Sequence, residues 1–270
     1  MSFYTSLNGL KNAQTDLGVI AHNIANAETS GFKKSRTQFG DIVVGSALTN
    51  PRMTVGIGAT VEAIVQDFAL GPIEQTGSAL DVAIAGDGFF STRSALSGNT
   101  LFTRNGAFEL DDAGFIHDGS GNRLQVFPTD AAGAVTSTTP ADAQVPLANA
   151  AGSPFAGVAV SENGNITATF ADGSAQVVGK VALASFIVPT GLRQVGSSNW
   201  QATGISGAAA YGEPGSGLYG NLFSGAIERS NVDIAEELVG LITAQRNFQA
   251  NAKAIDTATQ ISQTIINLRT

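Results

Sequence analysis

The stretch from residue 234 to residue 255, IAEELVGLITAQRNFQANAKAI, carries the pattern that decides the fold. Its apolar residues recur at alternating spacings of four and three, which is the a/d seam of a heptad helix. The same spacing runs along residues 3–24, FYTSLNGLKNAQTDLGVIAHNI, near the other end of the chain. A glutamine and an alanine occupy the same seam positions in both stretches. Each terminal segment is therefore predicted to be a helix with one apolar seam.

The two predicted seams extend over most of each helix. The first consists of Phe3, Leu7, Leu10, Gln14, Leu17, Ala21 and Ile24. The second consists of Ile234, Leu238, Leu241, Gln245, Phe248, Ala252 and Ile255 and continues, after a slip in register, through Ala258, Ile261, Ile265 and Leu268. The second helix would span about residues 233–269, roughly 55 Å in length. Asp233 would begin it through a capping box with either Ser230 or Glu236, and the turn-rich residues 26–31 should end the first helix.

Between the two helices the apolar pattern changes to a period of two. Asn105-Gly106, Asn163-Gly164 and Asp172-Gly173 each separate short runs of strand-forming residues. Short strands with turns about every eight to twelve residues indicate an all-β module over about residues 76–225. The predicted fold class is α+β and multidomain: the N- and C-terminal helices pair as a coiled-coil-like inner domain, and the central domain is mainly antiparallel β.

This pattern divides the chain into four predicted parts. Residues 1–30 are the N-terminal helix of the inner domain, and residues 31–75 are an extended linker with some strand. Residues 76–225 are the β-rich outer domain, and residues 226–270 are the C-terminal helix of the inner domain. Within the β domain, residues 128–154 are rich in Ala, Thr and Pro and are interpreted as a surface excursion.

The composition excludes several classes of function. Only 13% of the 270 residues are charged, against roughly 25% in an ordinary soluble domain. The formal charge is −8 with 14 Lys plus Arg, so no basic surface suits nucleic acid or an anionic membrane. The absence of cysteine excludes disulfides, thiolate nucleophiles and cysteine-ligated metals. Neither a cleaved signal peptide nor a membrane-spanning segment is expected.

No catalytic, cofactor-binding or metal-binding residue is nominated, and no cofactor is expected. Residues 215–220 fit G-x-G-x-x-G, but no βαβ unit surrounds them. Residues 118–122 weakly resemble a calcium loop, whose twelfth position would be Thr129 instead of a bidentate glutamate. The two histidines, His22 and His117, lie in unrelated segments and do not suggest a metal pair.

The seams allow two explanations. The helices could pack on each other as an ordinary pair within one chain, or several copies could close around them. Two helices alone leave about half of each a/d residue exposed. Amides and hydroxyls, more than ions, cover the other helix faces, which suits contacts on several sides. Assembly is therefore favoured. A coiled-coil adaptor is disfavoured because roughly 200 residues separate the helices.

Three stretches resemble the bacterial flagellar axial proteins of rod and hook. NIANAETSGFK at residues 23–33 resembles the N-terminal signature of that family. ALDVAIAGDGFF at residues 79–90, followed by TRNGAF at residues 103–108, resembles the start of its β domain. Residues 230–248 are similar to its C-terminal helix. The signature residues are Asn23, Asn26, Gly31, Phe32, Ser230, Asn231, Val232 and Glu237.

The resemblance implies an architecture and a set of partners. Many copies would form a helical tube, with the terminal helices inside and the β domains outside, through which later subunits travel. The chain would leave the cell through the flagellar type III export apparatus without signal cleavage and would reside in the flagellum at the cell surface. Its partners would be further copies of itself, the distal rod protein, the hook cap and the hook–filament junction proteins, with no nucleic acid and no membrane insertion.

Within the family, residues 191–200 and residues 215–220, which lead to residues 225–228, are most similar to a short hook protein. The expected function is thus a structural subunit of the hook, the flexible universal joint between rod and filament. The alternative is a distal rod protein, which would be part of a rigid drive shaft. Hook proteins usually carry an additional outer domain, and only residues 128–154 occupy its place in this chain. The stretch of residues 45–54 is also longer than the corresponding stretch of many hook proteins. A β-rich enzyme or binding module is the remaining class.

Overall fold

The computed structural model describes residues 2–44 and 55–268. The described residues form two compact units. The helical unit comprises residues up to 27, residues 34–67 and residues from 232 onward, and the β unit comprises residues 28–33 and 68–231. The four domains proposed from the sequence have other boundaries, after residues 30, 75 and 225, and they remain a prediction.

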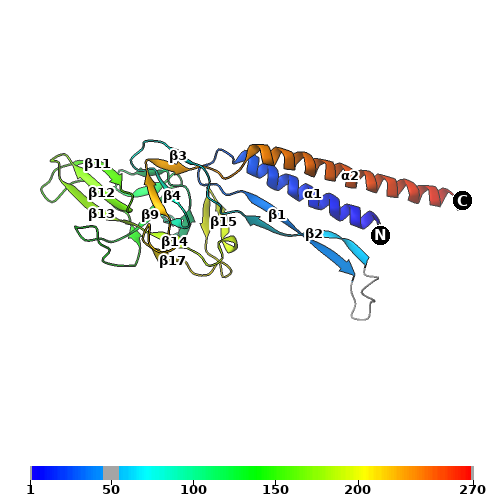
Figure 1. The fold of residues 1–270 in the computed structure, drawn as a ribbon, viewed down its shortest axis with the longest axis horizontal. Helices are drawn as coiled ribbons and strands as arrows, with labels where there is room; N and C mark the ends of the chain where they lie inside the picture. The colour runs from blue at the N-terminus through cyan, green and yellow to red at the C-terminus, as the bar shows by residue number, and fades with distance from the viewer. Residues whose placement is uncertain (1, 45–54, 269–270) are drawn as a thin grey trace. The chain divides into compact units, whose positions relative to one another are not determined.

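The helical unit contains α1 (Ser2–Ala25), α2 (Ile234–Asn267), β1 (Ser35–Val44) and β2 (Val55–Gln66). Figure 1 shows α1 and α2 side by side. They run antiparallel, because Gly9 of α1 lies against Asn251 of α2 whereas Ile20 lies against Gly240. The N-cap is Asp233, whose Oδ1 accepts hydrogen bonds from the Ala235 N–H at 2.8 Å and the Glu236 N–H at 3.3 Å. Both helices are thus confirmed close to their predicted ends, and residue 269 lies outside the described residues.

Residues 31–75 contain more regular structure than an extended linker with some strand. Strands β1 and β2 pair as a long antiparallel ladder from Ser35↔Gln66 to Val44↔Val55. Register shifts occur at Gln38/Phe39 and at Ile42/Val43. At each shift β2 carries one extra residue, Glu62 or Ile57, that has no partner on β1. The apolar residues of β2 alternate from Val55 to Val65, whereas those of β1 do not.

The β unit consists of short antiparallel strands. They are β3 (Ile73–Gln75), β4 (Val82–Ala85), β5 (Phe89–Ser94), β6 (Thr100–Thr103), β7 (Phe108–Leu110), β8 (Ile116–Asp118), β9 (Asn122–Phe127), β10 (Ala141–Asp142), β11 (Phe155–Val160), β12 (Asn165–Phe170), β13 (Ala175–Val181), β14 (Leu183–Ser185), β15 (Arg193–Gly196), β16 (Asn199–Gln201), β17 (Ala210–Gly212), β18 (Asn221–Ser224) and β19 (Ala226–Glu228), with a 3-10 turn at Pro189–Gly191. The main sheet follows the order β11-β12-β13-β9-β5-β6-β16-β15, while β18 pairs with β4 and β19 with β3. Together with the paired terminal helices, this confirms the α+β class.

Two apolar clusters fill the β unit. The larger contains Phe90, Ile116 and Ile166, and the smaller surrounds the fully buried Trp200. Residues 128–154 contribute to the larger cluster, because Ala143 and Val145 are buried in it. The prediction of a surface excursion is therefore wrong for the middle of this segment. Ala143 and Val145 face inward at a spacing of two, directly after the short strand β10. The Pro- and Thr-rich residues around them obscure this pattern in the sequence.

Two of the three predicted turns join paired strands. Asn163-Gly164 connects β11 to β12, and Asp172-Gly173 connects β12 to β13. Asn105-Gly106 separates strands that do not pair with each other, since β6 pairs with β5 and β16 whereas β7 pairs with β8. A Cβ atom at Gly106 would overlap the Val82 carbonyl oxygen, so glycine allows the backbone at residue 106 to approach the backbone of Val82 closely.

Candidate functional site

The contact between α1 and α2 is made largely by small residues. The only buried residue of α2 is Ala244, and Ala13 is among the few buried residues of α1. A Cβ atom on Gly9 would lie 2.5 Å from Oδ1 of Asn251, and one on Gly240 would lie 3.5 Å from Ile20. The helices therefore approach closely at Gly9 and Gly240.

The most buried residues of both helices lie beside the predicted seams. The buried residues Ala13, Ile20 and Asn23 of α1, and Ala244 of α2, each directly precede a predicted seam position. One residue corresponds to a rotation of about 100° around the helix axis. The seam is thus turned by about 100° from the line of buried residues, and part of it is exposed.

The exposure of the seam residues reflects this rotation. The half-buried members are Leu7, Leu10, Leu17, Ile24, Leu241, Phe248, Ala252, Ile255 and Ala258. The exposed members are Phe3, Gln14, Ala21, Ile234, Leu238, Gln245, Ile261, Ile265 and Leu268. The first set is therefore partly covered and the second set is exposed, as far as the described residues show.

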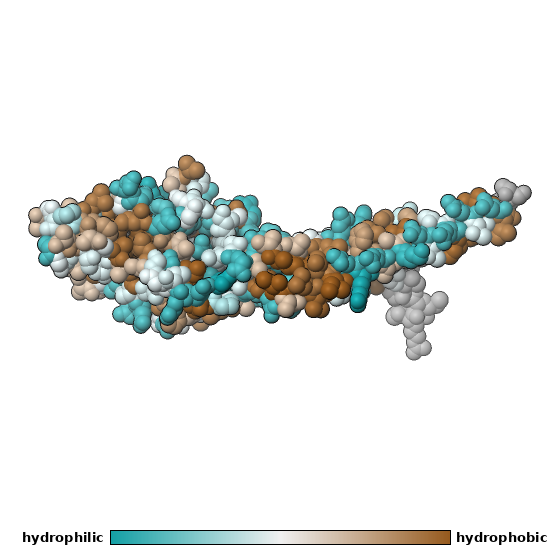
Figure 2. All heavy atoms as spheres, turned by 90° about the horizontal axis from the view of Figure 1, so that it is seen from above, coloured by the Kyte–Doolittle hydropathy of each residue, from teal (hydrophilic) through white to brown (hydrophobic). Residues whose placement is uncertain are grey.

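Exposed aliphatic residues gather at both ends of α2. We define the assembly surface as these residues, which are between 44% and 82% exposed: Ile234, Leu238, Val239, Ile242, Ile261, Ile265, Ile266 and Leu268. Figure 2 shows hydrophobic surface on the helical unit near the start of α2. At the other end, every residue from 259 to 268 is exposed. Because Gly9 already lies opposite Asn251, α1 is too short to cover these last turns.

The β1–β2 hairpin is fixed to α1 by asparagine side chains. Asn23 donates to the Ser35 carbonyl at 2.8 Å and to Oε1 of Glu237 at 3.2 Å, and its Oδ1 accepts from the Ser35 N–H at 2.9 Å. Asn12 donates to the Ala59 carbonyl at 2.8 Å. Two signature residues, Asn23 and Glu237, are thereby brought together at the start of the hairpin.

Most other signature residues lie in the β unit. Gly31 adopts a φ of +66° against the backbone of Asn105, a conformation and an approach that favour glycine. Phe32 and Ser230 are buried, and Asn231 donates to the Ala69 carbonyl at 3.2 Å. Of the remaining two, Asn26 bonds the His22 carbonyl at 2.9 Å in the helical unit, and Val232 is half-buried.

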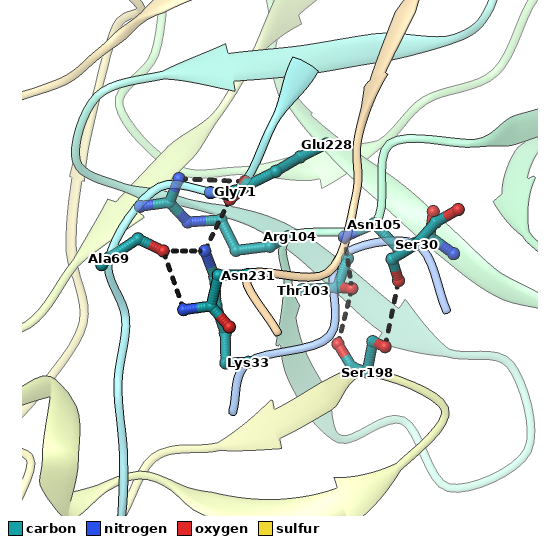
Figure 3. Close-up of polar contacts among 10 residues, drawn as sticks. All are labelled: Ser30, Lys33, Ala69, Gly71, Thr103, Arg104, Asn105, Ser198, Glu228 and Asn231. Atoms are coloured by element: carbon teal, nitrogen blue, oxygen red, sulfur yellow. Dashed lines mark hydrogen bonds and ion pairs between the residues drawn. The ribbon is translucent and has the colours of Figure 1, made fainter. Parts of the chain in front are cut away.

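A buried ion cluster holds residues 28–33 within the β unit (Figure 3). Glu228, which is fully buried, accepts from the Lys33 Nζ at 2.5 Å and from the Gly71 N–H at 2.8 Å through Oε1, and from an Arg104 nitrogen at 3.3 Å through Oε2. Lys33 also donates to the Ala69 carbonyl at 2.7 Å. Burial lowers the pKa of the Arg104 guanidinium, and the nearby carboxylates of Glu228 and Asp87 oppose that shift.

Sequence reasoning did not identify this cluster. A signal was nevertheless present, because Lys33 and Arg104 both lie in stretches that resemble the flagellar family, residues 23–33 and 103–108. The pairing itself has no local pattern, since Lys33 and Glu228 are 195 residues apart.

The described residues offer no alternative site with clear chemistry. No group of three or more His, Asp or Glu side chains among residues 2–44 and 55–268 could hold a metal ion. Asp118 accepts hydrogen bonds from the Ser120 and Asn122 backbone at 2.9 and 2.8 Å, as in a turn. Residues 215–220 lead directly into strand β18. Neither helix, as far as it is described, is long and apolar enough to cross a membrane.

Three protein-family models match the chain. The model described as flagella basal body rod protein matches residues 3–33. The flagellar hook protein FlgE/F/G D1 domain matches residues 83–168, and the flagellar basal body rod FlgEFG protein C-terminal model matches residues 224–268. The three matches cover the same parts of the chain as the resemblance described above.

Similar proteins align along the whole chain. The flagellar basal-body rod protein FlgG of Bacillus subtilis is 36% identical over 280 residues, covering 99% of this chain and 98% of its own length. The flagellar hook protein FlgE of Salmonella typhimurium is 29% identical over 411 residues, covering all of both chains. The flagellar hook protein FlgE of Escherichia coli is 26% identical over 410 residues, again covering both completely.

Proposed function

The chain belongs to the family of flagellar rod and hook proteins, and from that premise we propose that it is the structural subunit of the flagellar hook. Copies of it would assemble into a helical tube that joins rod to filament, bends as a universal joint and conducts exported subunits. The observation that carries self-assembly is the assembly surface: in the part of the chain that the structure describes, eight aliphatic residues of α2 and its C-cap are between 44% and 82% exposed. Surfaces of this kind mark protein–protein contacts.

The number of identical residues favours the hook over the rod. For the Salmonella hook protein, 29% of 411 aligned positions is about 119 identical residues, and for the E. coli hook protein 26% of 410 is about 107. For the B. subtilis rod protein, 36% of 280 is about 101. Since this chain has 270 residues, an alignment of 411 positions must include many positions that only the hook protein fills. The lower percentage identity to the Salmonella hook protein is therefore due to the additional residues that this relative contains.

A distal rod protein is the second candidate. The B. subtilis rod protein has the higher percentage identity and nearly the same length as this chain. Residues 45–54, which lie outside the described residues, form a longer stretch than in many hook proteins, a feature typical of the distal rod. In this role the same assembly surface would build a rigid shaft.

The proposals on enzymatic activity and on partners rest on membership of the family. We propose that the chain acts as a structural subunit without enzymatic activity, as the names of its relatives suggest. Its proposed partners are further copies of itself, the distal rod protein, the hook cap, the hook–filament junction proteins and the type III export apparatus.

Electron microscopy of a strain that lacks this gene tests the assignment. Basal bodies with complete rods and no hooks are expected for a hook subunit, and the wild-type gene should restore the hooks. Rods that end early would favour the distal rod. Intact rods and hooks in the deletion strain would contradict both candidates.

A further inference from the structure

Leu96 projects from the β unit on an ordered loop. It lies between β5 and β6, and its side chain is fully exposed. The loop is closed by hydrogen bonds from the Gly98 N–H to the Ser94 carbonyl and from the Ser94 N–H to the Asn99 carbonyl, both at 2.9 Å. A side chain held in one place by such bonds loses little further conformational freedom when a partner covers it.

An apolar cavity lies at the opposite end of β5. It has a volume of about 300 Å³, and its lining includes the aromatic residues Phe68, Phe89 and Phe186. Ile187 and Leu218 also line it and are themselves 90% and 82% exposed. The side chain of Arg104 contributes to the lining, and its buried Nε atom has no hydrogen-bond partner among the described residues.

The positions of the loop and the cavity suit contact between copies. Phe89 is the first residue of β5, and Leu96 follows its end, so about 20 Å of strand separates the two features in one copy. Leu96 therefore cannot fill the cavity of its own chain. A helical polymer needs two different, complementary patches on each subunit. Exposed Arg93 on the loop side and exposed Asp87 at the cavity are also opposite in charge.

We propose that neighbouring copies contact each other head to tail through their β units, with Leu96 of one copy inserted into the Phe68–Phe89–Phe186 cavity of the next. This inference rests on the proposed self-assembly and adds a second contact, distinct from the assembly surface of α2. An aliphatic side chain in an aromatic-lined cavity would fix the spacing of copies along the direction of β5.

Disulfide cross-linking tests the contact, because the chain has no cysteine of its own. Leu96→Cys is combined with Ile187→Cys in one variant and with Leu218→Cys in another, and each is polymerised and then oxidised. A disulfide needs Cα atoms roughly 4.4–6.8 Å apart, so only contact between copies can link these residues. We expect a ladder of covalent multimers from at least one pair. Leu96→Cys with Leu147→Cys, an exposed leucine that does not line the cavity, is the control and should give only background cross-linking.

A second variant measures the strength of the contact. Leu96→Ser should raise the protein concentration at which polymer appears by about tenfold or more, whereas Leu147→Ser should change it by less than about twofold. Polymer that forms at the normal concentration with Leu96→Ser, and that shows no ladder with either cysteine pair, overturns the contact and leaves the proposed function intact. If the wild-type chain forms no polymer under any condition, the proposed function fails and the contact fails with it.

Discussion

At the scale of single residues, Glu228 holds two cations inside the β unit. Its carboxylate bonds both Lys33 and Arg104, and all three side chains are almost completely buried. Water cannot solvate the cations if this carboxylate is lost. The cluster also attaches residues 28–33, which follow α1 in sequence, to strand β19 of the β unit.

We predict that Glu228→Gln destabilises the β unit by about 3–5 kcal/mol, because it leaves buried charge uncompensated. Urea unfolding followed by the fluorescence of Trp200, the only tryptophan and a fully buried one, measures the loss. Glu74→Gln is the matched control, since Glu74 pairs with Arg229 at the surface and should cost less than about 1 kcal/mol. Equal effects of the two variants would contradict the role of the cluster.

Asp172 provides a test by pH. Hydrogen bonds from the Ser174 hydroxyl and backbone N–H, and from Asn149, lower the pKa of this carboxyl from 3.8 to about 2. A lowered folded-state pKa contributes stability at pH values above about 4, and this contribution is lost as the pH falls towards 2. We expect an NMR titration midpoint for Asp172 of about 2. Ser174→Ala should raise it and Ser161→Ala, in a neighbouring turn, should not. A midpoint near 3.8 in the wild-type chain would show that Ser174 and Asn149 do not form these hydrogen bonds with Asp172.

At the scale of elements, the pairing of α1 with α2 depends on a close approach at Gly9. Gly9 and Gly18 both lie within α1, but a Cβ atom on Gly18 would meet nothing within 4 Å, whereas one on Gly9 would meet Asn251 at 2.5 Å. Both substitutions to alanine favour a helix by about 1 kcal/mol. Only one of them disturbs the contact.

We therefore predict that Gly18→Ala raises the thermal midpoint of the helical circular dichroism signal, whereas Gly9→Ala does not. The second variant would have to displace Asn251, which donates to the Asn247 carbonyl at 2.9 Å. Adding Asn251→Ala to Gly9→Ala should restore the gain. Equal stabilisation by the two alanine variants would show that the helices do not pack in this register.

The helices and strands also show which parts of the fold could be predicted from the sequence. Regular heptad spacing was sufficient to place α1 and α2, because a helix repeats locally. The same spacing did not identify the buried line of residues, which lies one position before the seam at Ala13, Ile20 and Ala244, and the role of the seam in assembly remains a prediction. Strand β1 was not identified because its apolar residues, Phe39, Ile42, Val43 and Val44, do not alternate. The Glu228 cluster joins residues that are far apart in sequence, and no local pattern encodes such a pairing.

At the scale of the whole molecule, the proposed assembly requires other copies to cover the last turns of α2. Residues 259–268 are exposed throughout and contain Ile261, Ile265, Ile266 and Leu268. We predict that deleting residues 259–270 prevents polymer formation while Trp200 fluorescence and the urea midpoint of the β unit stay unchanged. Normal polymer from the shortened chain would show that assembly does not need residues 259–270.

Self-association as a function of concentration shows whether the chain is the subunit of a polymer. The purified chain is concentrated, and sedimentation together with electron microscopy measures how much of it forms tubes. A structural subunit with the assembly surface of α2 should stay monomeric below a threshold concentration and convert to tubes above it, and Val239→Asp within that surface should raise the threshold strongly. A chain that stays monomeric at every concentration, with or without a preformed rod or hook as a seed, would contradict the account.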